Sequence, residues 1–479
     1  MVMMVLRQAL VLIDRDASRH FLQPDQIHLL RVGVWLGLIT LLAAAGGMLT
    51  FRMSVVAVLS NLEADARAFG EWLRSELRLP SRGHALALVA IVLIGAALRV
   101  TGLDHPMRFD ESDSFLHTVL TDWFNVWTDY TVPNNHIFYN LLAHFSVLTL
   151  GETATAARLP TLLAGIAIIP VLFFVGRALF GTHAGLLAAA LVSGLPVLVD
   201  YSTNARGYML ITLLFLLSIM PTVMLQQRRS ISAWGVVAVL MIAGLFTVPT
   251  MLFAFGTVLL MAWLAATPER RKPLIFESIG VVALCGFASI VLYLPPAMRC
   301  TWGAIISNRY VQPVTLDRAV RQIAKGLDFE STMSMEPASL LWVIVLGASL
   351  IISTRLPAGR RLLLALIIPA VAICVAGRFI PPPRVWLYML PIIALLSAVG
   401  LVQLIAQVLK SRAEGVFSWI AVAASLFLAI HLTAARATNP GFEQRFYQQI
   451  EETAHSLAPS LNSSSVIIAP VPINHPLQY

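Results

Sequence analysis

Charged residues are the scarcest feature of this sequence of 479 residues. Aspartate, glutamate, lysine and arginine together make up 12% of the chain, whereas hydrophobic residues make up 58%. Soluble domains carry about 25% charged and about 45–50% apolar residues. The mean hydropathy of +0.79 agrees with this imbalance. The composition therefore excludes an ordinary soluble domain and predicts an all-α polytopic membrane protein.

Cysteine is almost absent as well, and the three that occur lie far apart at Cys285, Cys300 and Cys374. They lack the spacing of a zinc site, and two fall inside apolar runs, so we expect neither a disulfide framework nor structural zinc. No glycine-rich phosphate loop follows a strand, so a nucleotide site is not expected. The polar start of the chain also lacks the short apolar core and cleavage site of a signal peptide.

Apolar runs of about 17–25 residues are what the sequence has in abundance, and they predict membrane-spanning helices. We expect these helices near 84–103, 156–176, 183–201, 205–225, 231–247, 248–267, 275–297, 337–355, 361–377, 384–407 and 415–435. With the N-terminal region and the loops added, the expected fold is a bundle of about 11–13 transmembrane helices. Outer interfacial helices are expected in the first large loop.

The net charge of +8 arises from short basic clusters that follow alternate apolar runs. No basic stripe with interleaved aromatic residues appears, so the pattern favours membrane orientation over nucleic-acid binding. The positive-inside rule then places every cluster in the cytoplasm and four segments outside, namely 104–155, 201–208, 298–336 and 377–384. We expect a multi-pass protein of the cytoplasmic (inner) membrane whose chemistry faces the periplasm or exterior.

Three parts are expected along the chain. Residues 1–83 form an N-terminal extension, in which a run near 29–50 either crosses the membrane or lies flat, followed by an amphipathic helix. Residues 84–435 form the transmembrane catalytic domain, with residues 104–155 as its first outer loop. Residues 436–479 form a short extracytoplasmic tail.

The segment 135–151 is apolar but short, and counting it as a span would invert the topology of everything after it. We interpret it as a helix in the membrane interface, with Asn135, His136, Asn140 and His144 on its polar face. A true span is the alternative.

An acidic cluster, RFDESDSFLHT, follows the span at 84–103 and holds Asp110, Glu111 and Asp113. Carboxylates beside hydrocarbon are costly to keep ionised unless a metal, a cation or a catalytic task compensates. Hydrocarbon on one side disfavours the charged form, which suits a general base. The alternative is a solvated loop with ordinary surface acids.

Arginines gather on the same predicted face. Arg206 lies in the YSTNARGY turn, and Arg378 and Arg384 flank the stiff IPPP turn. The guanidinium fork binds two phosphate oxygens at once, so this set suits a lipid phosphate. Snorkelling to lipid headgroups is the alternative for Arg206.

Three further candidates stand on the outer segments. His136 begins the interfacial helix, and Arg158 opens the next span in ARLP. Tyr208 ends the YSTNARGY turn. The alternatives are a hydrogen-bonded structural histidine, a helix-end anchor and an aromatic of the membrane interface, respectively.

The chain resembles the GT-C superfamily of membrane glycosyltransferases that use polyprenyl-phosphate sugars, closest to its protein mannosyltransferase and aminoarabinose transferase branch. The stretches that carry the resemblance are ALRVTGLDHPMRFDE, NNHIFYNLL, TAARLPTLLAG, GRALFG and YSTNARGYML, with RVWLYMLP more loosely similar. Asn135-His136-Ile137 stands where the family has a histidine followed by two prolines. The first 83 residues match nothing in that branch.

The resemblance implies a GT-C-type fold and a role for each matching residue. Asp110 would be the catalytic base, with Glu111 supporting it or helping to hold a divalent ion, Mg²⁺ or Mn²⁺. Arg206 and one of Arg378 or Arg384 would hold the lipid phosphate. Arg158 would help to organise the site. We also count Arg158, His136 and Tyr208 among the residues expected to bind the lipid phosphate or the sugar.

The predicted function is inverting transfer of a sugar from a polyprenyl-phosphate donor to an acceptor hydroxyl at the outer face. The acceptor is a glycan, a lipid or a protein, and the sequence names neither the acceptor nor the sugar. A lipid-linked sugar transporter or flippase is one alternative, and it should carry buried charges near the middle of the membrane. A non-catalytic membrane assembly subunit is the other, and it has no need of the Asp-Glu pair.

Overall fold

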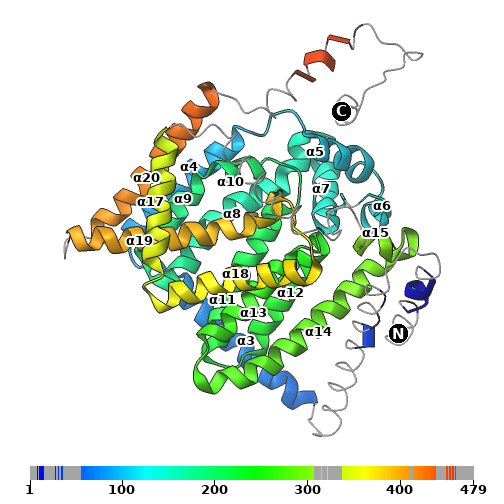
Figure 1. Cartoon of the computed structure of the whole chain (residues 1–479), viewed down its shortest axis with the longest axis horizontal. Coiled ribbons are helices and arrows are strands. Elements are labelled where there is room, and N and C mark those ends of the chain that lie inside the picture. The colour runs from blue at the N-terminus through cyan, green and yellow to red at the C-terminus, as the bar shows by residue number, and fades with distance from the viewer. Residues whose placement is uncertain are drawn as a thin grey trace.

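The computed structural model describes residues 55–132, 134–306, 337–409 and 414–438, together with isolated residues outside these ranges. The predictions for the run near 29–50, for most of the 298–336 loop and for nearly all of the 436–479 tail lie outside the described residues. Every regular element in the described part is helical (Figure 1), which confirms the predicted all-α fold.

The predicted spans correspond closely to helices of the structure. These are α4 (Arg82–Val100), α8 (Ala154–Phe180), α9 (Thr182–Ser193) with α10 (Pro196–Tyr201), α11 (Tyr208–Gln227), α12 (Ile231–Thr247), α13 (Met251–Ala265), α14 (Pro268–Arg299), α17 (Pro337–Ser353), α18 (Pro357–Gly377), α19 (Leu390–Leu409) and α20 (Glu414–Thr438). Within the described ranges, six helices are long and apolar enough to cross a membrane, and five further apolar helices are shorter.

The remaining helices are short or lie at the edges of the bundle. They are α3 (Val55–Leu77), α5 (Phe109–Ser114), a π-helix η1 (Phe115–Val119), α6 (Trp123–Thr128), α7 (Ile137–Leu150), α15 (Trp302–Ile306) and a 3-10 helix η2 (Pro383–Met389). The first outer loop thus contains short helices, as expected. Figure 1 shows α5, α6 and α7 together at one end of the molecule.

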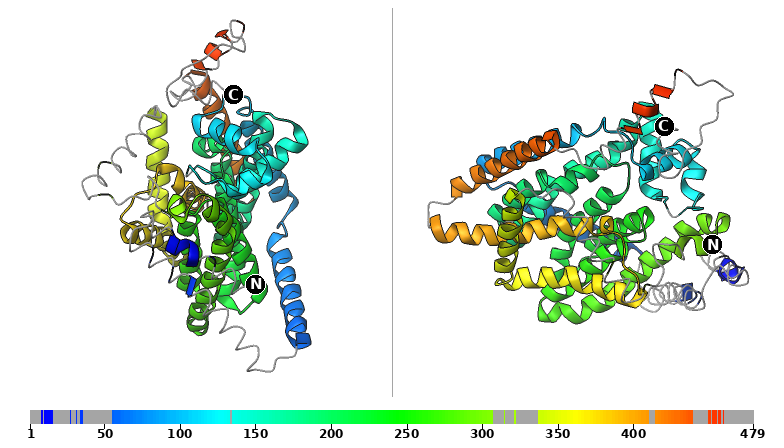
Figure 2. Two further views of the ribbon diagram at one scale, coloured as in Figure 1. Left: turned by 90° about the vertical axis from the view of Figure 1, so that its right-hand side faces the viewer. Right: turned by 45° about the horizontal axis from the view of Figure 1, so that its top comes forward.

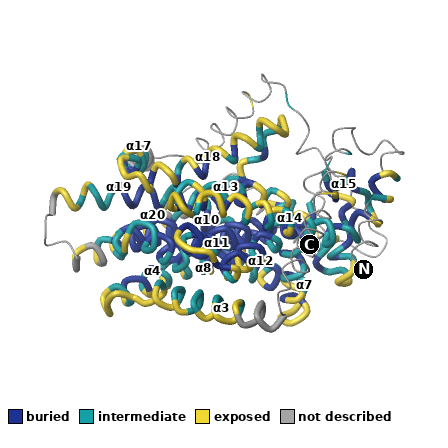
Figure 3. Tube along the Cα trace, turned by 90° about the horizontal axis from the view of Figure 1, so that it is seen from below, coloured by how far each residue is buried: buried dark blue, intermediate teal, exposed yellow. Residues whose placement is uncertain are grey.

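Helix α11 forms the centre of the bundle. In its 18-residue apolar stretch 83% of the residues are buried, whereas in that of α14 only 17% are buried. A helix that is apolar on every side needs protein or lipid around its whole circumference. Helix α11 packs against α8, α12 and α13, so its partners are protein. Figure 3 shows the buried residues concentrated around α8, α10 and α11 and the exposed ones along α3 and the outer helices.

The predicted span 183–201 is wrong as one continuous helix, because α9 ends at Ser193 and α10 starts at Pro196. Proline has no N–H to continue a helix and is favoured at a helix start. The break frees carbonyl groups at the end of α9, and the fully buried Arg99 binds them. Its Nη1 donates to Ser193 O at 2.8 Å and its Nη2 to Val192 O at 3.1 Å.

Helix α7 spans 14 residues, about 21 Å at an α-helical rise of about 1.5 Å per residue. This is shorter than the hydrocarbon layer of about 30 Å. Its predicted polar face is turned inward: His144 Nδ1 lies 2.7 Å from Val119 O, and Asn140 is completely buried. Phe145 and Leu148 are exposed instead. The polar side of α7 therefore packs against the protein, and an apolar side is exposed.

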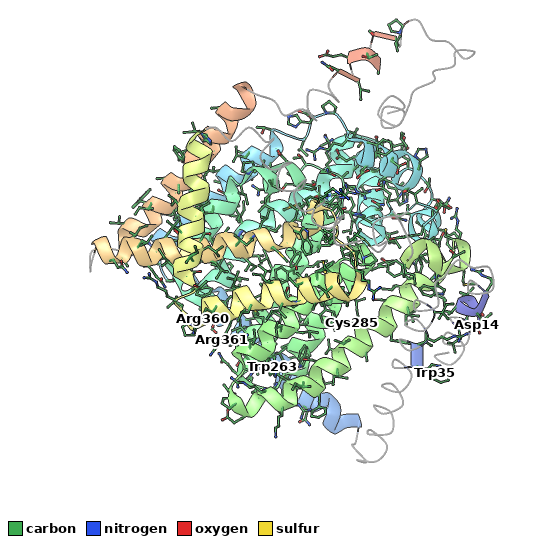
Figure 4. The ribbon with its side chains drawn as sticks, viewed as in Figure 1. Asp14, Trp35, Trp263, Cys285, Arg360 and Arg361 are labelled. Carbon is green, nitrogen blue, oxygen red and sulfur yellow. The ribbon has the colours of Figure 1, made fainter. Side chains whose placement is uncertain are left out.

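Helix α3 is the predicted amphipathic helix, and it runs along the outside of the bundle (Figure 2). Asp65 anchors it, because its Oδ2 accepts from Ser232 N at 2.7 Å at the start of α12. Arg360 and Arg361 project from the first turns of α18, in the same region of the view as Trp263 near the end of α13 (Figure 4). Helices α13 and α18 pack against each other, and residues 270–272 follow α13 at the start of α14. The basic clusters at 270–272 and 360–361 therefore lie near the same end of the α13–α18 pair, as the charge pattern predicts.

Candidate active site around Asp110, Glu111 and Arg206

The acidic residues open the short helix α5, which starts after Arg108. Glu111 Oε2 accepts a hydrogen bond from Arg108 N at 3.0 Å, so the glutamate caps its own helix. Adjacent residues on a helix point about 100° apart, and Asp110 and Glu111 accordingly enter different surroundings.

Glu111 is buried in an ion pair with Arg158 of α8, and each side chain is 1% exposed. Arg158 Nε donates to Glu111 Oε1 at 3.0 Å, and Nη2 donates to Oε2 at 3.1 Å. Ala205 N also donates to Oε1, at 2.6 Å. Burial raises the pKa of Glu111, but the Arg158 guanidinium and the hydrogen bonds outweigh it and leave this pKa below its usual value.

Arg158 uses all five of its N–H groups within the protein. Besides Glu111, its Nη1 donates to the carbonyl groups of Leu103 and His105, both at 2.6 Å, and its Nη2 donates to Pro106 O at 3.3 Å. A guanidinium has five donors and no more. Arg158 therefore holds Glu111 and the 103–106 loop in place, and it has no donor left for a substrate.

Arg206 lies in the turn between α10 and α11, and it is 3% exposed. Its Nη1 donates to Asn134 O at 2.8 Å and to Ser114 Oγ, and lies 3.4 Å from Asp110 O. Its Nε is buried without a hydrogen-bond partner, and no carboxylate among the described residues forms an ion pair with it. Arg206 is therefore a buried cation that is short of acceptors.

His136 adds to this shortage. Gly207 N donates to its Nδ1 at 2.9 Å, while Arg206 Nη2 lies 2.9 Å from its Nε2. A neutral imidazole accepts at only one nitrogen, so two donors compete for one lone pair. Burial lowers the pKa of His136, and Arg206 and Arg384 lower it further, so the ring is neutral. The Tyr208 ring packs edge-on against it at 4.9 Å.

Asp110 pairs with Arg384 of η2, with 3.2 Å between Oδ2 and Nη1. The pair is open to solvent, because Asp110 is 33% exposed and Arg384 is 28% exposed. Arg378 is exposed at the end of α18, where its backbone adopts the left-handed region with φ 53°. Of the two arginines around the IPPP turn, the structure therefore brings Arg384 to Asp110.

The residues do not fit the predicted divalent ion as a carboxylate pair. Both oxygens of Glu111 are occupied by Arg158, Ala205 and Arg108, so the side chain has no free face for a metal. No group of three or more His, Cys, Asp or Glu side chains suited to a metal is present in the part of the chain that the structure describes. A divalent ion at Asp110 alone stays a prediction.

Sequence reasoning missed the residues that hold the Arg206 turn. Ser202 Oγ accepts from Arg99 Nε at 3.1 Å, which connects the turn to the buried arginine of α4. Gly165 of α8 makes room, because a Cβ there would lie 2.1 Å from Ser202 Oγ. The signal was present as an arginine inside an apolar run, since such residues are rare and costly in spans.

One family model matches part of the chain. Residues 134–298, about a third of the chain, match the family model for dolichyl-phosphate-mannose-protein mannosyltransferases. The chain is similar to the GT-C membrane glycosyltransferases. The match confirms the predicted resemblance in the segment with His136, Arg158 and Arg206, whereas Asp110 and Arg384 lie outside it. No curated protein sequence matches the chain.

Two solved structures of the oligosaccharyltransferase of Archaeoglobus fulgidus are also similar. The first, AglB in complex with an inhibitory peptide and a dolichol-phosphate, is 12% identical with a TM-score of 0.47. The second, tethered with an acceptor peptide, is 12% identical with a TM-score of 0.46. The alignments cover 81% and 82% of this chain, but only 61% and 60% of those proteins.

Proposed function

We propose that the protein is an inverting glycosyltransferase that moves a sugar from a polyprenyl-phosphate donor to an acceptor hydroxyl at the outer face of the membrane. The observation that carries the proposal is Arg206, a buried guanidinium without a carboxylate partner beside a solvent-open carboxylate. Burying a cation without compensation is expensive. An anionic phosphate oxygen supplies the missing acceptor.

Arg384 provides the second contact to the donor phosphate, which replaces Asp110 as the partner of this guanidinium. An ion pair as exposed as Asp110–Arg384 contributes only about 0–1 kcal/mol. A donor phosphate presents more charge and two oxygens to the guanidinium, so it displaces the carboxylate. Donor binding thereby releases Asp110 at the moment when a base is needed.

Asp110 then accepts the proton of the acceptor hydroxyl as its oxygen attacks the anomeric carbon. The bond from that carbon to the lipid phosphate breaks, and Arg206 and Arg384 stabilise the charge that develops on the phosphate. Base catalysis by a carboxylate typically contributes about 10²–10⁴-fold. A single displacement inverts the anomeric configuration. Glu111 and Arg158 stay paired throughout and hold α5.

The positions of the buried arginines support this reaction over a transport pathway. Arg99 lies in the last turn of α4 and Arg158 in the second turn of α8, so both are at helix ends. A lipid-linked sugar transporter is expected to carry its buried charges near the middle of the membrane. An assembly subunit gives no reason for a buried Arg206 without a carboxylate partner.

The test uses purified protein in detergent with a panel of polyprenyl-phosphate sugars and candidate acceptor extracts. The expected result is release of polyprenyl phosphate together with a new glycoside, whose anomeric configuration is opposite to that of the donor by nuclear magnetic resonance. Retained configuration would contradict the single displacement. Movement of donor across vesicle membranes without any glycoside would favour the transporter.

A further inference from the structure

A second site lies at the opposite end of α4 from Asp110. A cavity of about 710 Å³ opens among the first turns of α4 and α9 and the side of α20. These three helices pack against one another (Figure 1). The 19 residues of α4 place the cavity roughly 28 Å from the acidic cluster, at an α-helical rise of about 1.5 Å per residue. It belongs to neither the donor nor the acceptor region.

Hydrogen-bond donors gather on one wall of the cavity. Ser81 Oγ accepts from His84 N at 3.3 Å and lies 2.7 Å from His84 Nδ1. When the serine hydroxyl gives its hydrogen to Nδ1, His84 carries its own proton on Nε2. That Nε2 is buried, and no described residue pairs with it. The His183 ring lies 6.0 Å from the His84 ring and lines the same cavity.

The electrostatics of the cavity favour an anion. None of the described residues that line it is acidic. Both α4 and α9 begin at its wall, so the positive ends of two helix dipoles meet there. Arg82, in the first turn of α4, directly follows Ser81 of the lining and adds a positive charge near it.

The rest of the lining is mostly apolar and includes residues on the outer surface of the bundle. Leu86 and Trp419 line the cavity, and they are 71% and 75% exposed. Ala87, Ala90 and Val422 complete this apolar part. An occupant must therefore combine an anionic head with a hydrocarbon chain that lies along the surface facing the bilayer.

We propose that this cavity binds the headgroup of an anionic phospholipid from the leaflet opposite the candidate active site. The phosphate accepts hydrogen bonds at the wall of His84 and His183, and an acyl chain lies along Leu86 and Trp419. The proposal does not depend on the sugar-transfer reaction.

The test measures lipid bound to the intact, delipidated protein by native mass spectrometry. Phosphatidylglycerol is expected to be retained at least about fivefold more than phosphatidylcholine, which corresponds to about 1 kcal/mol. The double variant His84→Leu/His183→Leu should lose this preference. His431→Leu, on α20 but stacked on Phe427 away from the cavity, should keep it. Equal retention of both lipids by the unaltered protein would overturn the proposal.

A second variant covers the case in which the double variant does not fold. Ala90→Trp fills the cavity and leaves both histidines in place, so it should also abolish the preference.

Inorganic phosphate distinguishes a lipid from a free ion. Millimolar phosphate should leave phosphatidylglycerol bound, because the acyl chain contributes to binding. Complete displacement by phosphate, or full retention of lipid in Ala90→Trp, would contradict the assignment to a lipid.

Discussion

The two neighbouring carboxylates of α5 occupy opposite environments. Glu111 is 1% exposed and bound by Arg158, Ala205 and Arg108, whereas Asp110 is 33% exposed and has an exchangeable pair with Arg384. A buried, fully bonded pair resists change, while an exposed pair is worth little and opens readily. This difference is the reason for the proposal that Glu111 stabilises the site and that Asp110 takes part in the reaction.

The largest effect on stability is expected when the inner half is broken. Arg158→Met leaves Glu111 buried without its cation, and this should lower the free energy of unfolding by about 3–5 kcal/mol. Thermal unfolding in detergent measures the loss. The double variant Arg158→Met/Glu111→Leu should recover part of it, since the two side chains form one unit.

Arg299→Met is the matched control for that experiment. Arg299 is 40% exposed and lies 4.0 Å from Asp129, so its loss should cost no more than about 1 kcal/mol. Equal losses from Arg158→Met and Arg299→Met would contradict the structural role of the Glu111–Arg158 pair.

Arg206 should affect donor binding more than folding. Arg206→Met removes the proposed charge-assisted hydrogen bonds to the phosphate, so the dissociation constant for polyprenyl phosphate should rise about 10- to 100-fold. The loss of stability should be smaller than for Arg158→Met, because no buried carboxylate is left unpaired. Arg206→Lys keeps the charge without the planar fork and should restore affinity only in part.

His136 predicts a pH dependence of stability. Its pKa is well below 6.5 in the folded protein, so the unfolded chain binds more protons just below pH 6.5. The contribution of His136 to the free energy of unfolding should therefore be fully present above about pH 6.5. Below that pH, the free energy of unfolding should fall by up to about 1.4 kcal/mol per pH unit. Titrating chemical unfolding from pH 7.5 to about pH 5 measures this slope. His136→Gln should flatten it, and an unchanged slope would exclude His136 as the source.

The smallest effect is expected at Arg378. It is exposed and does not reach Asp110, so Arg378→Ala should change stability by less than about 0.5 kcal/mol and leave the transfer rate nearly unaltered. Arg384→Ala should reduce the rate at least about 10-fold, equivalent to about 1.4 kcal/mol. A reversed order of the two effects would show that the IPPP turn presents the other arginine to the donor.

Much of this arrangement was predictable from the sequence, because apolar runs and arginine clusters report directly on membrane burial. The approximate positions of most spans, the acidic cluster and the candidate role of Arg206 followed from such local patterns. Long-range pairing did not. Nothing near Glu111 in the chain indicates that a guanidinium 47 residues away satisfies it, or that Asp110 is left with Arg384.

The break between α9 and α10 shows the same limit. Pro196 was visible, yet an apolar run with a proline is compatible with one kinked span. What the run could not show is that Arg99, from another helix, donates to the carbonyl groups that such a break frees. The sequence also did not indicate where the polar face of α7 points, because the partner of His144 lies in the preceding loop.

A side-by-side comparison of Asp110→Asn and Glu111→Gln tests most directly whether Asp110 acts in the reaction and Glu111 in stability. Both replace a carboxylate by an amide of the same shape, and transfer rate and melting temperature are measured on the same preparations. Asp110→Asn should keep its melting temperature and lose about 10²–10⁴-fold in rate. Glu111→Gln should melt at a lower temperature. Full transfer activity in a well-folded Asp110→Asn protein would contradict the account.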